Sequence, residues 1–153
     1  MNYKHTQISY LIIVITLFVL VLFAWIYITA RAEPPSIDSG TNFAVTSVMA
    51  LILFILTSFT SLQVKIDEQY LRIKFGYGIY TKKFLLNDII SAKDVKNHWY
   101  FGWGIRRWLW PKMWIYNVSG FDAVEIKLKN GKTYRIGTDE PKKLEHNILQ
   151  SIK

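Results

Sequence analysis

The side chains that most often carry catalysis or bind metals are few in this sequence and lie far apart. The chain has no cysteine, which excludes thiolate catalysis, disulfides and every metal site that contains cysteine. Its three histidines, His5, His98 and His146, lack the His-x-x-x-His or carboxylate spacing of a metal site, and no Gly-x-Ser-x-Gly nucleophile motif occurs. We therefore expect neither enzymatic activity nor a metal or other cofactor.

A phosphate-binding loop is suggested only by Gly131, Lys132 and Thr133, which match the end of that motif. The motif would require its first glycine where this chain has Ile126. Asn130 followed by Gly131 is instead a strong signal for a tight β-hairpin. We therefore interpret this segment as a hairpin turn.

The most unusual segment for binding is residues 98–114, which contain five of the six tryptophans together with basic side chains. Indole rings prefer the headgroup level of a bilayer, where neighbouring Arg and Lys side chains meet phosphate. The segment therefore predicts a contact with lipid or with a protein partner, although about two or three of its tryptophans should be buried in the protein. Stacking on nucleic-acid bases is a competing use, which we rank lower because no nucleic-acid-binding motif accompanies the segment. The candidate contact residues are Trp99, Trp103, Arg106, Arg107, Trp108, Trp110 and Lys112.

Two long apolar runs precede this segment in the chain and should hold it close to a membrane. Residues 8–30 and 43–62 contain no charged side chain, and about 20 apolar residues in a helix are enough to cross the hydrocarbon layer of a bilayer. We expect a transmembrane helix over each range and an external loop over residues 31–42, where Pro34 and Pro35 oppose helix formation. The alternative for the first run is a signal peptide cleaved near Ala32, but the run is longer than the apolar part of such a peptide.

The distribution of Lys and Arg predicts on which side of the membrane the ends of the chain lie. The loop contains one such residue, Arg31, and Lys4 precedes the first run. Five basic residues follow soon after the second run: Lys65, Arg72, Lys74, Lys82 and Lys83. By the positive-inside rule, residues 1–7 and 63–153 are therefore cytoplasmic. The sequence predicts a multi-pass protein of the plasma or inner membrane, with both termini in the cytoplasm.

The chain after the second run has the pattern of short β-strands. Val64 and Ile66, and then Leu71, Ile73 and Phe75, alternate with polar residues, as in strands with one buried face. A C-terminal helix should close the sheet structure with one apolar face, made by Leu144, Ile148 and Ile152. Further strands are expected between these elements, over about residues 79–85, 89–95, 113–116, 123–128 and 133–136.

Two groups of residues in this part of the chain resemble a known family. The first is Gly102-Trp103-Gly104-Ile105-Arg106, followed by Trp114-Ile115-Tyr116-Asn117-Val118-Ser119-Gly120 and Ala123-Val124-Glu125-Ile126; the second is Ile136-Gly137-Thr138-Asp139-Glu140-Pro141. Over about residues 61–152 the chain resembles bacterial membrane proteins with a pleckstrin-homology-like (PH-like) domain. The resemblance implies a β-barrel or sandwich of about seven strands with a capping C-terminal helix, held at a membrane. It implies no established reaction.

Eukaryotic PH domains that bind phosphoinositides often carry basic residues on their first two strands. Lys65, Arg72 and Lys74 match that spacing loosely. Here Asp67 and Glu68 lie in the turn between the strands, where they would repel a polyphosphate. We therefore expect these three basic residues mainly to be solvated charges on the outer face of the sheet.

Charge gives the last indication of function. Residues 61–153 hold 17 Lys and Arg against nine Asp and Glu, which accounts for the whole net charge of +8. Each Lys or Arg that reaches an anionic leaflet contributes about 1 kcal/mol of attraction. The sequence therefore predicts a membrane-anchored PH-like binding or adaptor module that contacts anionic lipid headgroups or a protein partner, either another membrane protein or a second copy of the chain. The alternative is a small accessory subunit of a larger membrane protein complex.

Overall fold

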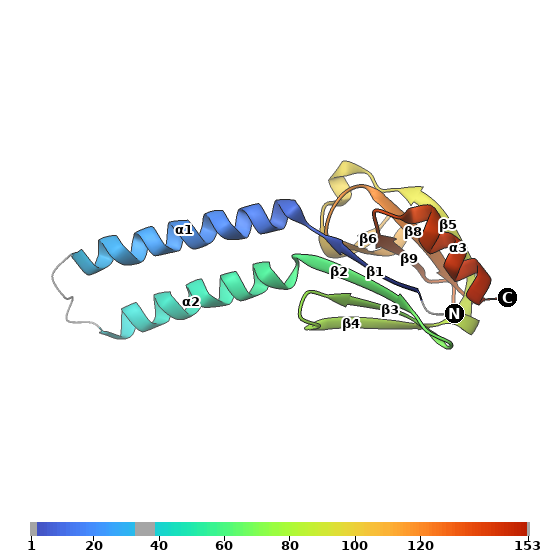
Figure 1. The fold of residues 1–153 in the computed structure, drawn as a ribbon, viewed down its shortest axis with the longest axis horizontal. Helices are drawn as coiled ribbons and strands as arrows, with labels where there is room; N and C mark the ends of the chain where they lie inside the picture. The colour runs from blue at the N-terminus through green and yellow to red at the C-terminus, as the bar shows by residue number, and fades with distance from the viewer. Residues whose placement is uncertain (1–2, 33–38, 153) are drawn as a thin grey trace.

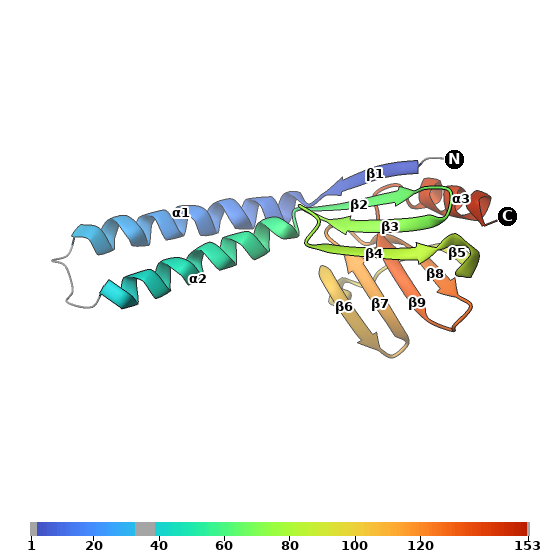
Figure 2. The ribbon, with the colours of Figure 1, turned by 90° about the horizontal axis from the view of Figure 1, so that it is seen from below.

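A computed structural model describes residues 3–32 and 39–152, and in it two helices project from a β-rich domain (Figure 1). The helices α1 (Tyr10–Ala32) and α2 (Ser39–Ser58) lie side by side and point away from the domain (Figures 1 and 2). Within the described ranges, α1 is long and apolar enough to cross a membrane, over Tyr10–Ala30, whereas the apolar part of α2 is shorter, Asn42–Ser58. The expected turn at Pro34 and Pro35 lies outside the described residues.

The chain ahead of α1 is a strand, which the sequence did not predict. β1 (Tyr3–Ile8) pairs antiparallel with β2 (Ser61–Ile66), from Tyr3 opposite Ile66 to Ile8 opposite Ser61. Most of residues 1–7, expected only to be a cytoplasmic N-terminus, therefore belongs to the first sheet. For the same reason α1 begins at Tyr10 rather than at residue 8, and α2 ends at Ser58 rather than at residue 62.

Two sheets make up the β domain. The first has the order β1-β2-β3-β4, with β3 (Tyr70–Phe75) and β4 (Tyr80–Leu85), and all its neighbours are antiparallel. The second has the order β5-β8-β9-β7-β6, in which β7 and β9 are parallel. Its strands are β5 (Ile89–Lys96), β6 (Gly104–Leu109), β7 (Lys112–Asn117), β8 (Asp122–Leu128) and β9 (Thr133–Gly137). Short 3₁₀ turns lie at Leu86–Asp88 (η1) and Trp99–Phe101 (η2).

The described residues thus form sheets of four and five strands that do not close into a barrel. Of the expected barrel or sandwich of about seven strands, the barrel is therefore excluded, whereas two packed sheets are compatible with the sandwich. Two unpredicted strands explain the larger number of strands. They are β1 and β6, and β6 lies inside the tryptophan-rich segment 98–114, where no strand was expected before residue 113. The strands expected between residues 79 and 136 are confirmed to within one residue at each end. The hairpin at Asn130 and Gly131 is also confirmed, since Gly131 has φ of +76° and its N–H donates to the carbonyl of Leu128.

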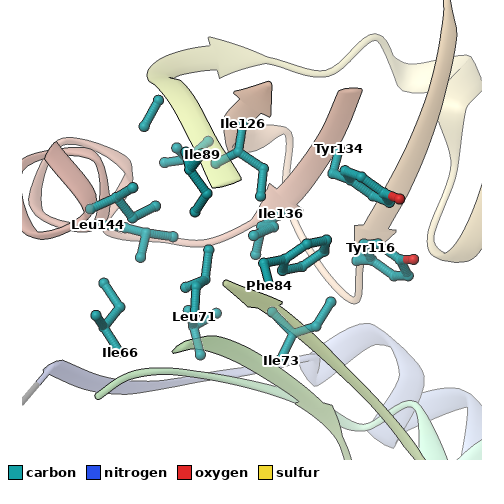
Figure 3. Close-up of a cluster of buried hydrophobic side chains, with 14 of the residues drawn as sticks. Ile66, Leu71, Ile73, Phe84, Ile89, Tyr116, Ile126, Tyr134, Ile136 and Leu144 are labelled. Atoms are coloured by element: carbon teal, nitrogen blue, oxygen red, sulfur yellow. The ribbon is translucent and has the colours of Figure 1, made fainter. Parts of the chain in front are cut away.

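The two sheets face each other across an apolar core (Figure 3). Leu71 and Ile73 of the first sheet and Ile126 and Ile136 of the second are fully buried there. The helix α3 (Pro141–Ser151) packs against β5 and β8. Its face is the predicted stripe, with Leu144 and Ile148 fully buried and Ile152 partly buried.

Candidate functional site

The tryptophan-rich segment, residues 98–114, is positioned by three elements: η2, β6 and β7. Phe101 of η2 joins Met113 and Ile115 of β7 in a small buried cluster separate from the main core. Trp108 of β6 packs on this cluster, with its ring centroid 4.9 Å from that of Phe101. The Arg135 guanidinium of β9 lies 5.6 Å from the centroid of the same Phe101 ring. These contacts fold the segment back onto the second sheet, so that it is not a free loop.

None of the five tryptophans in this segment is buried, which corrects the expectation that two or three would be. Trp99 and Trp110 are 79% and 88% exposed, Trp103 and Trp114 are 39% and 36% exposed, and Trp108 is half-buried. Trp99, Trp103 and Trp110 lie outside the strands, in η2, just before β6 and in the turn between β6 and β7. Trp108 lies on β6, which among the described strands is an edge strand with β7 as its one neighbour.

The beginning of β6 borders an open groove at the ends of the two helices. Residues 102–106 form one wall, and apolar side chains form the other: Leu11, Ile12, Ile15, Ile55, Leu56 and Phe59. The groove has a volume of about 690 Å³. Arg106 Nε donates a 3.1 Å hydrogen bond to the carbonyl of Trp103. This bond holds the guanidinium against the wall made by residues 102–106. Figure 2 shows that β6 begins next to the helices and runs away from them.

The other end of the β6–β7 hairpin borders a smaller, basic pocket of about 240 Å³. Arg107 and Lys112 line it together with Lys132 from the turn between β8 and β9. Trp114 supplies an aromatic wall. No acidic side chain is among the described residues that line this pocket. Beside it, the exposed side chains of Leu109 and Trp110 form the tip of the hairpin.

The structure therefore divides the predicted contact residues between two places. Trp103 and Arg106 lie at the helix-side groove, whereas Arg107, Lys112 and Trp110 lie at the hairpin tip. Trp108 also lies at the hairpin tip, where it packs on Phe101. Trp99 lies apart from both places, in a shallow pocket with the chain around Phe121. A single flat surface that carries all seven residues does not form.

Lys65, Arg72 and Lys74, the loosely matched phosphoinositide positions, lie on adjacent strands of the first sheet, with Lys65 opposite Arg72. Arg72 Nε is 2.9 Å from the Asp67 carboxylate. Burial alone would raise the pKa of Asp67, but hydrogen bonds from the Tyr70 and Gln69 backbone N–H groups and the nearby Arg72 charge outweigh it and lower this pKa. Arg72 is thus engaged by the acidic turn that was expected to disfavour a polyphosphate.

The three histidines lie in different parts of the domain. His5 of β1 bonds the carboxylate of Asp139 and lies 3.5 Å from that of Glu140, which ties β1 to the start of α3. His98 stacks on Tyr100 with centroids 5.0 Å apart, and His146 is exposed on α3. Within residues 3–32 and 39–152, no group of three or more His, Asp or Glu side chains is placed to hold a metal ion.

Three tyrosines in the core have raised pKa values. Burial, together with the Glu140 and Asp139 carboxylates, raises the pKa of Tyr3 to about 12. Burial is also the main cause of the raised pKa of Tyr116, whose hydroxyl lies 3.2 Å from that of Tyr80, and of Tyr134. These phenols therefore stay protonated near neutral pH, as expected of packing side chains.

Sequence reasoning missed the helix wall of the groove and one cation of the tip pocket. The groove-lining residues of α1 and α2 belong to uniformly apolar runs, so nothing distinguishes them from their neighbours before the β domain is placed. Lys132 was interpreted only as part of a hairpin turn. Its adjacency to Lys112 depends on the parallel pairing of β7 with β9, which has no local sequence signal.

Comparison of the chain with protein-family models, with curated proteins and with solved structures finds no match.

Proposed function

We propose that this chain is a two-span membrane protein whose β domain binds the anionic headgroups of the leaflet beside it. The observation that carries the proposal is the groove at the helix ends, where apolar side chains of α1 and α2 face Trp103 and Arg106. An indole and a guanidinium next to apolar helix ends are the side chains that the interfacial layer of a bilayer favours. The excess of basic residues in the domain adds attraction to the same leaflet.

The β1–β2 ladder supports an even number of membrane crossings. β1 precedes α1, β2 follows α2, and the two strands are hydrogen-bonded neighbours along their whole length. If α1 crosses the membrane, α2 must cross back, since otherwise the paired strands would lie on opposite sides. The ladder also favours a retained anchor over a cleaved signal peptide, because cleavage near Ala32 would remove β1 from the sheet.

The polar residues of α2 are compatible with a membrane span. The apolar part of α2, Asn42–Ser58, is about 25 Å long at 1.5 Å per residue, a few Å less than the hydrocarbon layer of about 30 Å. Hydroxyl groups along α2 donate to carbonyls four residues earlier, as from Thr46 to Asn42 and from Ser58 to Phe54. Their donors are therefore satisfied inside the helix, which lowers the cost of placing them in lipid.

The distribution of basic residues supports a cytoplasmic location of the β domain. Lys4 and the basic side chains that follow α2 lie at the same end of the helix pair, and the positive-inside rule assigns that end to the cytoplasm. We therefore propose a cytoplasmic β domain and cytoplasmic termini, in the plasma or inner membrane.

We also retain the PH-like family as a proposal. Two packed sheets followed by a C-terminal helix are compatible with it. The edge strands β1 and β6 are additions to the expected seven strands. The proposal of lipid binding does not depend on this family, because it rests on the groove.

A second candidate function is docking of a protein partner at the hairpin tip, as in an accessory subunit of a membrane complex. Trp110 and Leu109 are exposed on a hairpin that points away from the helices (Figure 2). Beside them, Arg107, Lys112 and Lys132 make the surface cationic. A lipid contact at the helix-side groove would not account for these exposed apolar and basic side chains at the hairpin tip.

Topology can be tested first because the chain contains no native cysteine. Single variants Ser36→Cys and Lys153→Cys should react with a membrane-impermeant maleimide from opposite sides of sealed vesicles. Labelling of both from the same side would refute the two-span arrangement with a cytoplasmic domain.

Lipid binding can then be tested with the full chain in nanodiscs of neutral phosphatidylcholine, with and without anionic phosphatidylglycerol. Hydrogen exchange of the backbone amides in residues 102–106 should slow when the anionic lipid is present, while exchange in residues 130–133 stays unchanged. Identical exchange at residues 102–106 in both bilayers would refute the proposed function. A photo-crosslinking residue in place of Trp110 tests the second candidate, which requires one defined protein adduct in cells.

A further inference from the structure

The groove beside β6 has two chemically different walls. Leu11 and Ile15 of α1 and Ile55 of α2 are exposed into or beside it and make one wall apolar. The opposite wall is formed by residues 102–106, which include Trp103 and the cationic Arg106. The volume of about 690 Å³ lies within the range of about 300 to 1,000 Å³ of sites that hold one small ligand.

The Arg106 guanidinium lies against the backbone of its own wall, at Gly102 and Trp103. The Nε atom of Arg106 donates to the Trp103 carbonyl, and the guanidinium lies so close to Gly102 that a Cβ there would be 3.2 Å from its central carbon. Gly102 has φ of +65°, a conformation that glycine adopts without strain. In the described parts of the chain, the Trp103 carbonyl is the one hydrogen-bond acceptor of the Arg106 side chain, and no acidic residue lines the groove. Its two terminal nitrogens are therefore available to an anion.

We infer that this groove binds a single anionic phospholipid of the facing leaflet, with its phosphate at Arg106 and an acyl chain along the apolar helix wall. The inference rests on the proposed function and names the ligand of the same surface. A guanidinium is suited to phosphate because its planar N–H groups match two phosphate oxygens. A lipid fits better than free phosphate, because an ion would leave the apolar wall uncovered at the depth where acyl chains begin.

The test uses the full chain, extracted in mild detergent from membranes that contain equal amounts of phosphatidylcholine and phosphatidylglycerol. Native mass spectrometry then counts the phospholipids that each chain retains. We expect one retained lipid, enriched in phosphatidylglycerol over the starting membrane. Arg106→Gln should reduce that enrichment about fivefold, the effect of one basic residue at an anionic surface. Arg107→Gln is the matched control, because Arg107 lies outside the groove and should leave the enrichment unchanged.

The apolar wall is tested with a second matched pair. Ile15→Trp places a large ring in the groove and should prevent lipid retention. Val14→Trp adds the same ring to the neighbouring exposed position, which does not line the groove, and should retain the lipid. An unchanged melting temperature of the β domain in each variant shows that the fold is intact.

Several results would overturn the inference. Equal anionic enrichment in the wild type and Arg106→Gln would exclude Arg106 as the phosphate ligand. Retention of the lipid by Ile15→Trp would exclude the helix wall as the site of the acyl chain. Displacement of the lipid by millimolar inorganic phosphate would identify a free-anion site instead. Absence of any retained lipid, while residues 102–106 still respond to anionic nanodiscs in hydrogen exchange, would refute the single-lipid site and leave the proposed function standing. Absence of both signals would refute both.

Discussion

The placement of β1 in the first sheet can be tested through Tyr3. This side chain is 7% exposed and belongs to the main core, whereas Lys4 on the same strand is exposed. Replacing a buried large aromatic side chain by alanine costs about 3 to 5 kcal/mol. β1 is an edge strand, and the Tyr3 hydroxyl has no hydrogen-bond partner among the described residues. We therefore expect Tyr3→Ala to lower the unfolding free energy of the β domain by the smaller value, about 3 kcal/mol.

The assay is urea unfolding of the full chain in mild detergent, followed by tryptophan fluorescence. Five of the six tryptophans lie in the β domain, so the signal reports mainly on its unfolding. With a denaturant slope of about 1 to 3 kcal/mol per molar urea for a small domain, a loss of about 3 kcal/mol lowers the midpoint by about 1 to 3 M. The control Lys4→Ala should change the free energy by about 0.5 kcal/mol or less.

An unchanged midpoint for Tyr3→Ala would show that β1 does not pack in the domain. That result would also remove the argument for paired membrane crossings, because the argument requires β1 and β2 to be hydrogen-bonded neighbours. A loss of equal size in Lys4→Ala would indicate a general effect of changing the N-terminal segment and would contradict the burial pattern.

Three further predictions use the same assay. Leu144→Ala in α3 should lower the unfolding free energy by about 2 to 5 kcal/mol. The control Leu149→Ala, at a 36% exposed position of the same helix, should lower it by much less. Equal losses in the two variants would contradict the buried apolar stripe of α3. Raising the pH from about 10 to 12 should destabilise the domain, because the unfolded chain releases the Tyr3 proton near its ordinary pKa of 10.0 while the folded state holds it to about 12. Tyr3→Phe should reduce this pH dependence, and an unchanged slope would show that Tyr3 ionises freely in the folded state. Trp110→Ala should leave the midpoint unchanged because the ring is exposed, and a large shift would mean that the hairpin tip packs on the domain.

The strands that sequence analysis predicted are those whose burial pattern is local. In β3, Leu71, Ile73 and Phe75 alternate with Arg72 and Lys74, and all three apolar residues are buried. Such a pattern is readable within one strand because side chains alternate between the two faces of a sheet. The apolar stripe of α3 is readable in the same way, at helical spacing.

The two missed strands lack this local pattern. β1 has the sequence Tyr-Lys-His-Thr-Gln-Ile, and Gln7 rather than an apolar side chain fills one of its buried positions. Its partner β2 follows both helices in the chain, so the two strands are not joined by a short turn whose residues could predict the pairing. In β6, Arg106 and Arg107 are adjacent and both exposed, which breaks the alternation. An edge strand with one neighbour tolerates such a sequence because little of it is buried.

The candidate site was predictable in composition but not in arrangement. The cluster of tryptophans and basic residues in residues 98–114 indicated a contact surface. Because β6 forms a hairpin with β7, its two ends face different surroundings, and the segment divides between the helix-side groove and the tip. That division depends on where the hairpin lies relative to α1 and α2, which is a property of the whole fold.

The joint between the helices and the β domain contains few residues and is tightly packed. Ser9 alone separates β1 from α1, and two residues, Phe59 and Thr60, separate α2 from β2. The Ser9 N–H donates a 2.8 Å hydrogen bond to the Thr60 carbonyl. The turn after β3 packs against the end of α2 so closely that a Cβ at Gly76 would lie 2.5 Å from a backbone oxygen of Ser58. With no free tether in the joint, the direction of the helices fixes the orientation of the domain. If the helices span the membrane, the beginning of β6 is therefore held at the leaflet before any lipid binds, and binding there does not carry the entropic cost of ordering a flexible linker.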